Sequence, residues 1–224
     1  AFGAFVGGGA NSVAVYKGIV AAAVEADTVT DPGAVAFFDT DGNFLNLVMV
    51  GALPDMLTFT PDGETVLVAN EGVPDDGVDP EGSVSIISIK DGPASATVRT
   101  ADFNAFDTSL DTLRAAGVRL FPDVANTPLA AGRISVSQDL EPEYIAVDGK
   151  SKVAMVTMQE ANALAVVDIK QARVLDILPL GTKDHNIPGA GLDPSDRDGG
   201  IAIANWPVRG LYMPDAIASY KVKK

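Results

Sequence analysis

The chain has 224 residues and a formal net charge of −14, from 30 acidic and 16 basic side chains. This balance argues against nucleic acid as a partner, because phosphate backbones are bound through Lys and Arg, and it favours divalent cations. The absence of cysteine excludes disulfides, thiolate zinc sites and cysteine nucleophiles, and no apolar run of about 20 residues is present to span a membrane. Hydrophobic residues make up 47 % of the chain, which is enough for a sizeable core and too much for a disordered protein.

The first ordered segment covers residues 11–51. It contains NSVAVYKGIVAAAVEAD, then GAVAFFDTDG, then FLNLVMVG. Apolar residues alternate or run in short blocks, and Gly- or Asp-containing turns separate the blocks, which is typical of consecutive antiparallel strands. The opening AFGAFVGGGA is too short and too Gly-rich for a whole signal peptide, and we interpret it as a mature N-terminus left by processing.

The second segment, residues 54–101, repeats this pattern most clearly. It contains LPDMLTFTPDGETVLVANEG, then GSVSIISIKDG, then ATVRTADF. Four strands are predicted, starting near Met56, Thr65, Ser83 and Ala96. An insertion follows at 102–138, in which Leu110, Leu113 and Ala116 recur at helical spacing and predict one short helix.

The third segment, residues 142–181, has the same pattern in EPEYIAVDGKSKVAMVTMQEAN, ALAVVDIKQ and ARVLDILPLG. A second insertion, 182–212, is rich in Gly, Asp and Pro. Residues 214–220 then begin the pattern a fourth time, in MPDAIASYKV, and predict the first strand of another unit. Long loops on rigid scaffolds often carry function.

Units of roughly 40 residues with four short strands each predict an all-β fold, a β-propeller. A β-sandwich with similar hairpins is the alternative, but the recurring Pro-acid start of each unit favours the propeller. Propellers close with about four to eight blades. We therefore expect this chain to be the N-terminal part of a single propeller, whose remaining segment lies in a second chain of the same protein or has been lost.

Acidic residues recur at two positions of the repeat. One set follows the proline that opens the first strand, and the other ends the second strand. Because first and second strands are antiparallel, both sets are expected at one mouth of the central channel. The first set is Asp55, Glu143 and Asp215, with Asn11 in the first unit, and the second is Glu25, Glu71 and Glu160.

Carboxylates gathered in this way repel one another unless a cation neutralises them. Their oxygens suit the hard cations Ca²⁺, Mg²⁺ and Mn²⁺, and a pair of metals about 4 Å apart could bind a phosphoryl oxygen and activate water. The alternative is that these acids only cap turns and accept backbone N–H bonds.

The second insertion offers two further candidates. His185, in KDHNIPG, is the single histidine and is either a metal ligand or acid/base group, or a loop residue held by local hydrogen bonds. Asp193, Asp196 and Asp198, in LDPSDRDGG, resemble a calcium loop without the full spacing or the terminal Glu of an EF-hand.

Several long segments resemble the choice-of-anchor I family of exported bacterial propellers, from about residue 10 onward. They are LPDMLTFTPDGETVLVANEG, DLEPEYIAV, QEANALAVVDI, LPLGTKDHNIPGAGLDPSDRDGGI and NWPVRGLYMPDAIASY. Family members are often labelled alkaline phosphatase-like, and the family looks related to a seven-bladed propeller phosphotriesterase, a haloalkylphosphorus hydrolase with a two-metal centre. The resemblance implies an exported, periplasmic or surface protein with seven blades when complete.

The resemblance further implies metal-dependent hydrolysis of phosphoesters, most directly organophosphate triesters, at a binuclear centre of Mn or Zn. Carried over to this sequence, it implies Glu143 as a metal ligand, followed by Glu160, Glu71 and His185, with a small-molecule phosphoester as substrate. The alternative is a non-enzymatic extracellular scaffold that binds calcium, and a third hypothesis is a lactonase-like propeller hydrolase.

Overall fold

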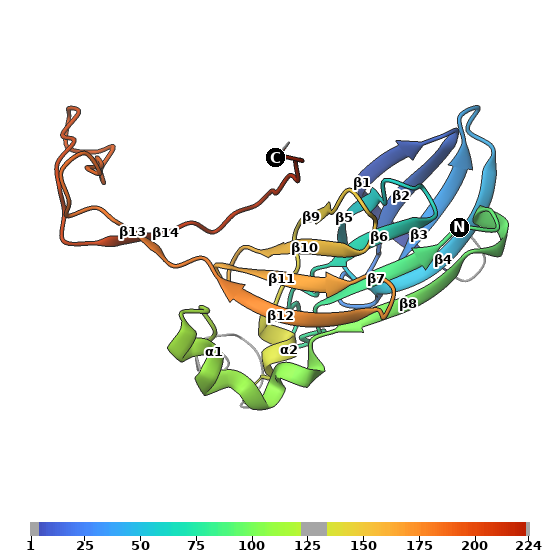
Figure 1. Cartoon of the computed structure of the whole chain (residues 1–224), viewed down its shortest axis with the longest axis horizontal. Coiled ribbons are helices and arrows are strands. Elements are labelled where there is room, and N and C mark those ends of the chain that lie inside the picture. Colours follow the sequence, from blue (N-terminus) through green and yellow to red (C-terminus); the bar gives the residue numbers. More distant parts are fainter. Residues whose placement is uncertain (1–4, 122–133, 223–224) are drawn as a thin grey trace.

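The computed structural model describes residues 5–121 and 134–222. This part of the chain forms three four-stranded antiparallel sheets and one two-stranded hairpin. The order of strands within each four-stranded sheet follows the chain, so each is a meander of the kind that builds a propeller blade. The fold is mostly β, with few and short helices, as the repeats predicted (Figure 1).

The three sheets coincide with the three repeats, and we call them blades 1, 2 and 3. Blade 1 comprises β1 (Gly7–Tyr16), β2 (Ile19–Ala26), β3 (Pro32–Asp39) and β4 (Phe44–Ala52). Blade 2 comprises β5 (Pro54–Phe59), β6 (Thr65–Asn70), β7 (Ser83–Ser88) and β8 (Thr97–Asp102). Blade 3 comprises β9 (Ile145–Val147), β10 (Val153–Met158), β11 (Ala163–Asp168) and β12 (Arg173–Pro179).

Blade 2 lies between the other two, and the alternation of its side chains divides the core. In β6 the side chains of Val66 and Val68 join a buried cluster shared with blade 1. Leu67 and Ala69, which point the opposite way, join a second cluster shared with blade 3. Because successive residues of a strand face opposite sides of the sheet, a near-continuous apolar run such as TVLVA is what a blade covered on both faces requires.

The first insertion packs against the second of these clusters. Its predicted helix is present as α1 (Leu110–Ala116), whose Leu110 and Leu113 are buried. The helix ends at Gly117, which adopts the left-handed conformation (φ 105°) that favours glycine. Two elements were not predicted here: a 3₁₀ helix, η2 (Asn104–Ser109), and a short helix, α2 (Val136–Asp139), which Ser135 and Gln138 cap reciprocally.

The second insertion, residues 182–212, forms an arm that projects from the end of β12 and returns to blade 3 (Figure 1). Its base is the hairpin of β13 (Thr182–Asp184) and β14 (Arg209–Leu211), which the sequence analysis did not predict. A short 3₁₀ helix, η1 (Pro93–Ser95), links β7 to β8.

The strand predicted at 214–220 is absent from the structure as described. These residues run past β9 without ladder partners, and the side chain of Ser219 donates a hydrogen bond to the Val147 carbonyl (2.8 Å). A strand is defined by backbone pairing with a neighbour, and no described segment forms such a ladder with residues 214–220. No helix among the residues described is long and apolar enough to cross a bilayer.

Candidate acidic site

Blades 2 and 3 bring most of the recurring acids together. Six carboxyl groups form what we call the acidic cluster, within which each of them raises the pKa of at least one other. They come from the starts of β5 and β9, the ends of β6 and β10, and the segment after the arm. Its members are Asp55, Glu71, Glu141, Glu143, Glu160 and Asp215.

Glu143 is the most enclosed member of the cluster. Its backbone N–H donates to the Thr157 carbonyl (2.9 Å), which extends the β9–β10 ladder and fixes the residue. Glu143 is only 8 % exposed, and its carboxylate accepts no hydrogen bond from any residue in the described ranges. Burial, followed by the charges of Glu71 and Asp55 and two further acids, raises its pKa to about 8.

Glu71 and Glu160 occupy the same repeat position, at the ends of β6 and β10. The Glu71 N–H donates to the Leu53 carbonyl (2.9 Å), and burial together with Asp55, Glu141 and Glu160 raises the Glu71 pKa to about 7. Glu160 presents a fully buried Oε2 that accepts no hydrogen bond from the described protein. A buried carboxylate oxygen without a donor is unfavourable in a folded protein, so Glu160 Oε2 could accept a ligand such as a cation.

Three acids were not expected from the sequence: Glu141 within the acidic cluster, and Asp79 and Asp139 beside it. Burial and the neighbouring charges of Glu160, Asp139 and Asp79 raise the pKa of Glu141 to about 7. Burial and Asp139 raise the pKa of Asp79 to about 6, and Asp79 Oδ1 is buried without a partner among the described residues. Glu141 precedes Glu143 by two residues in EPEY. Residues two apart in an extended segment face the same side, so the spacing indicated that both acids lie together. Asp79 and Asp139 lie outside the repeat positions and gave none.

The first insertion brings positive charge to the edge of this region. Arg119 Nη1 donates to the Glu160 carbonyl (3.0 Å), and its guanidinium lies 4.4 Å from the centre of the Phe121 ring. The pKa of Asp139 is raised by burial, while the Phe121 N–H, Arg114 and Arg119 act to lower it. Arg119 therefore partly balances the outer side of the cluster, while Glu143 and Glu71 have no cationic partner among the residues that the structure describes.

In blade 1 a different pair of residues occupies the same two repeat positions. Asn11 occupies the place of Asp55 and Glu143, and Glu25 that of Glu71 and Glu160. Asn11 Nδ2 donates to Glu25 Oε2 (3.1 Å) and also lies 3.2 Å from the Pro54 carbonyl. For Glu25 the interpretation as a structural hydrogen-bond acceptor therefore holds.

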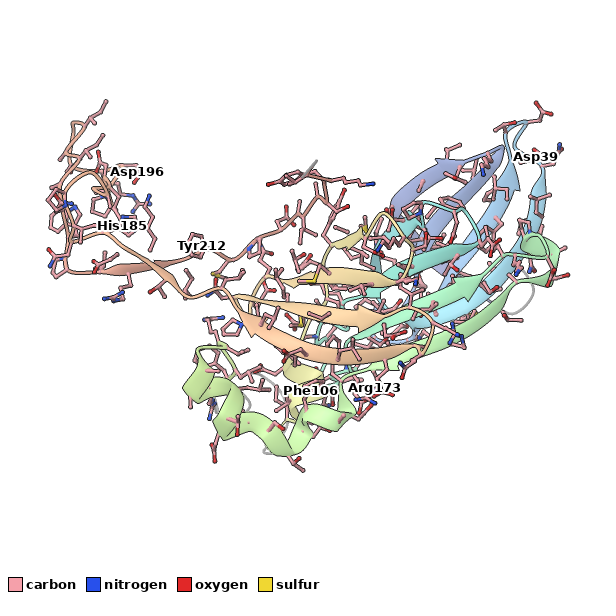
Figure 2. All side chains as sticks on the ribbon, viewed as in Figure 1. Asp39, Phe106, Arg173, His185, Asp196 and Tyr212 are labelled. Atoms are coloured by element: carbon pink, nitrogen blue, oxygen red, sulfur yellow. The ribbon has the colours of Figure 1, made fainter. Side chains whose placement is uncertain are left out.

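The arm keeps its candidate residues away from the cluster. Figure 2 shows His185 and Asp196 together in the arm, beyond Tyr212 and away from the three sheets. His185 Nδ1 donates to the Ala190 carbonyl (2.7 Å), because a carbonyl oxygen can only accept. His185 thus orders its loop, and the structure does not bring it to the glutamates.

The proposed calcium loop is held by its own backbone. Asp193 Oδ1 accepts from the Ser195 N–H (3.3 Å) and its Oδ2 from the Ala202 N–H (2.9 Å). Asp198 Oδ1 lies 3.5 Å from the Gly200 N–H, and Asp196 is highly exposed beside Arg197. Such bonds are typical of aspartates that cap turns, so the loop is explained by its own backbone hydrogen bonds.

The fit to a metal ion is mixed. Carboxylate oxygens suit hard divalent cations, Glu143 is only 8 % exposed, and Glu160 Oε2 is buried without a hydrogen-bond partner among the described residues. Yet within the described part of the chain no three Asp, Glu or His side chains lie close enough to hold one ion. Two carboxylates at most could therefore contact a given ion, and the remaining ligands would come from water, substrate or another segment.

Comparison with known proteins gives a family. The model of the choice-of-anchor I domain matches residues 2–224, while no curated protein matches. Similar solved structures include hydrazine synthase of Kuenenia stuttgartiensis (14 % identity, TM-score 0.47) and the β-propeller domain of Cps50 (Swd1) from Myceliophteria thermophila (8 % identity, TM-score 0.48). A third is the β-propeller domain of the Trilobed protease from Pyrococcus furiosus, at 7 % identity and TM-score 0.39.

These matches cover 75 %, 77 % and 78 % of this chain, and 48 %, 44 % and 45 % of the other chains, respectively. The chain therefore spans less than half the length of these three matched chains. The family assignment rests on the domain model, which covers nearly every residue, and on the blades described above. The chain belongs to the choice-of-anchor I domain family.

Proposed function

We propose that this chain contributes carboxylates to a divalent-cation site at the acidic cluster, and that the complete protein uses the site to hydrolyse phosphoesters, organophosphate triesters most directly. The observation that carries the proposal is Glu143, which is buried, accepts no hydrogen bond from the described chain and faces acids from blade 2 and from the segment after the arm. A cation placed there would relieve the repulsion that its neighbours create.

The roles of the chain's own residues follow from their positions. Glu143, with Glu71 or Glu160, would supply the oxygen ligands, and Arg119 at the edge of the cluster would attract the anionic product. A bound divalent cation would supply polarisation of the phosphoryl oxygen and a water of lowered pKa. Manganese and zinc are the metals proposed for this site, two ions being the number that the family resemblance implies.

Proton handling is a second capability of the same carboxyl groups. Because the pKa values of Glu71 and Glu143 are raised to about 7 and about 8, both protonation states are populated near neutral pH. Groups with such pKa values are efficient general acids and bases. Without a cation, Glu143 would hold its proton, and binding of a cation would release it.

The test is a cation and turnover measurement on the complete protein. Isothermal titration with Mn²⁺, Zn²⁺ and Ca²⁺, together with a phosphotriester hydrolysis assay, is applied to the wild type, Glu143→Gln and the control Glu25→Gln. We expect Glu143→Gln to weaken cation binding about 100-fold and to remove turnover, since a ligand and a charge are both lost. Glu25, which is paired with Asn11, should be dispensable. Full turnover in Glu143→Gln would refute the proposal.

A second function is favoured by one observation. Since no three described acidic or histidine side chains share one ion-binding position, the cluster also suits a non-enzymatic extracellular scaffold that binds Ca²⁺ weakly through two carboxylates and water. Exchangeable Ca²⁺ without phosphotriester turnover would support this function over the first. Both functions suit an exported protein, and in both the remaining propeller segment is proposed as a second chain that completes the ring.

A further inference from the structure

The acidic cluster contains one member, Asp215, that does not belong to a blade. It follows the arm, in an extended segment that runs back toward β9 (Figure 1). The charge of Asp215 nevertheless raises the pKa values of both Asp55 and Glu143, the acids at the starts of β5 and β9. Some feature of the fold must therefore return the chain to the cluster after an excursion of about thirty residues, and loop closure of that length is entropically unfavourable.

Asn162 has the contacts to do this. It ends the β10–β11 turn in the left-handed conformation (φ 49°), which Asn tolerates better than most residues, and it is only 1 % exposed. Its Nδ2 donates to the Gly181 carbonyl (2.8 Å), at the point where the chain enters the arm. Its Oδ1 accepts from the N–H groups of Tyr212 (2.9 Å) and Met213 (3.1 Å), where the chain leaves the arm.

The β13–β14 hairpin pairs the two ends of the arm with each other, and this one buried side chain ties both ends to blade 3. A backbone bond from the Leu180 N–H to the Asn162 carbonyl (3.0 Å) strengthens the entry side. On the exit side, both lone pairs of Oδ1 are used, so the side chain is close to saturated. Among the described residues, the returning segment makes one other hydrogen bond to a blade, from Ser219 to Val147, four residues beyond Asp215.

The arm itself is internally ordered, so releasing its base frees it as a unit. Trp206 Nε1 donates to the Leu192 carbonyl (3.1 Å), and Asn205 Nδ2 donates to the His185 carbonyl (3.0 Å). Leu192 and Ala204 form an antiparallel β-bridge. These bonds lie within the arm and none of them fixes its direction relative to blade 3. The direction depends on the contacts at the base.

We propose that Asn162 is a positioning residue of the acidic cluster, which closes the arm onto blade 3 and thereby places Asp215 beside Asp55 and Glu143. The consequence for cation binding rests on the proposed function, whereas the placement of the segment does not.

The placement is tested by distance measurement on the complete protein. Because this chain has no cysteine, spin labels can be attached at Ala216→Cys, next to Asp215, and at Asp41→Cys, in the exposed β3–β4 turn of blade 1. Electron–electron resonance then gives the distribution of distances between them. We expect a narrow distribution in the otherwise wild-type protein and a broad one in Asn162→Gly, which keeps the left-handed backbone and loses all three side-chain bonds.

Two further variants separate positioning from general destabilisation. Asn162→Asp keeps the acceptor oxygen for Tyr212 and Met213, and should restore the narrow distribution. Lys17→Gly changes another left-handed residue (φ 46°), in the β1–β2 turn away from the arm, and should leave the distribution unchanged. Hydrogen exchange at the Tyr212 and Met213 amides should be about 10- to 100-fold faster in Asn162→Gly than in the wild type.

A narrow distribution in Asn162→Gly would overturn the proposal, and so would an Asn162→Asp distribution as broad as that of Asn162→Gly. In the cation titration, Asn162→Gly and Asp215→Asn should weaken Mn²⁺ binding by a similar factor, about 10-fold or more. Weakening by Asp215→Asn alone would also contradict it. If the wild type binds no Mn²⁺, the proposed function fails, and the spin-label distances still decide the role of Asn162.

Discussion

Blades 1 and 3 place different side chains at the same two positions of the repeat. In blade 1 the pair is Asn11 and Glu25, joined by an amide-to-carboxylate hydrogen bond near the surface. In blade 3 the pair is Glu143 and Glu160, both carboxylates, and the described structure gives neither side chain a donor. The backbone geometry of the repeat is shared, while the electrostatic outcome is opposite.

The difference shows that a repeat fixes where a side chain lies but not what it does there. One amide in place of one carboxylate converts a charged pocket into a satisfied structural contact. The absence of such an amide in blades 2 and 3 leaves the raised pKa values of Glu71, Glu141 and Glu143. An energetic deficit of this kind, retained in a folded protein, is a reason to expect a ligand.

The strongest way to break the comparison is to displace the acids of blade 3. Gly82 lies where an added Cβ would overlap the Leu140 carbonyl oxygen and approach Pro142 Cδ to 2.7 Å. Gly82→Ala should lower the free energy of unfolding by about 3 kcal/mol, the upper end of the usual cost of overpacking, because backbone cannot yield as a flexible side chain can. Urea denaturation measures it. Gly149→Ala is the control, since its Cβ would meet no atom within 4 Å.

The next prediction concerns the sign of the change in the free energy of unfolding, which should be opposite for substitutions in blade 3 and blade 1. At pH 8.5, above the Glu143 pKa of about 8, Glu143→Gln should stabilise the cation-free protein by about 1–3 kcal/mol, since it removes a buried charge without a partner. Thermal unfolding in the presence of a chelator measures this change. A variant less stable than the wild type under these conditions would contradict the assignment of Glu143 as an unpartnered carboxylate.

The pH dependence of stability follows from the same groups. Glu71, Glu141 and Glu143 bind their protons more tightly in the folded state, so their stabilising effect is complete below about pH 4.5, their ordinary pKa, and is lost as the pH rises through 7 to 8. Turn aspartates Asp39 and Asp148, whose pKa values are lowered chiefly by hydrogen bonds to backbone and Asn43, act in the opposite direction below about pH 4.

The cation-free protein should therefore be most stable on the acidic side of neutrality. Denaturant titrations between pH 4 and 9, with and without Mn²⁺, check this, and a saturating cation should flatten the decline above pH 6. A stability that rises steadily from pH 5 to pH 9 without metal would contradict the raised pKa values.

The smallest effect is expected in blade 1. Asn11→Ala removes one exposed hydrogen bond to Glu25 and one contact with the Pro54 carbonyl, and should lower the free energy of unfolding by about 0.5–1 kcal/mol at any pH above 5. Denaturation at pH 5 and pH 8 tests both the size and the lack of pH dependence. A loss that grows with pH would mean that blade 1 shares the electrostatics of blade 3.

The sequence predicted the elements that depend on local pattern. Alternating Val, Leu and Ile between Pro-Asp-Gly turns gave the strands of blade 2 within two residues of β5–β8, and Leu110 and Leu113 gave α1. The recurrence of Glu71, Glu143 and Glu160 at matching positions indicated that they meet, because strand polarity carries that information. Glu141 was not predicted although its spacing from Glu143 indicated it, whereas the approach of Asp79 and Asp139 depends on how the chain packs around blade 3.

Three features were decided by tertiary structure alone. The hairpin of β13 and β14 has only three residues per strand, too few for alternation to be visible. Residues 214–220 have a strand-like sequence without a neighbour to pair with. Asn162 has the sequence of an ordinary turn residue, and its role comes from contacts with Gly181 and Met213, nineteen and fifty-one positions away.

The sequence by itself determined the repeat, the blade, the acidic character and the positions where carboxylates would stand. The tertiary structure decided which of these carboxylates are buried, which have a donor, and that His185 stays in the arm. The physical reason is the difference in sequence separation over which these interactions act. Strand alternation and turn chemistry act between neighbours in the chain, whereas desolvation and charge repulsion act between residues that only packing brings together.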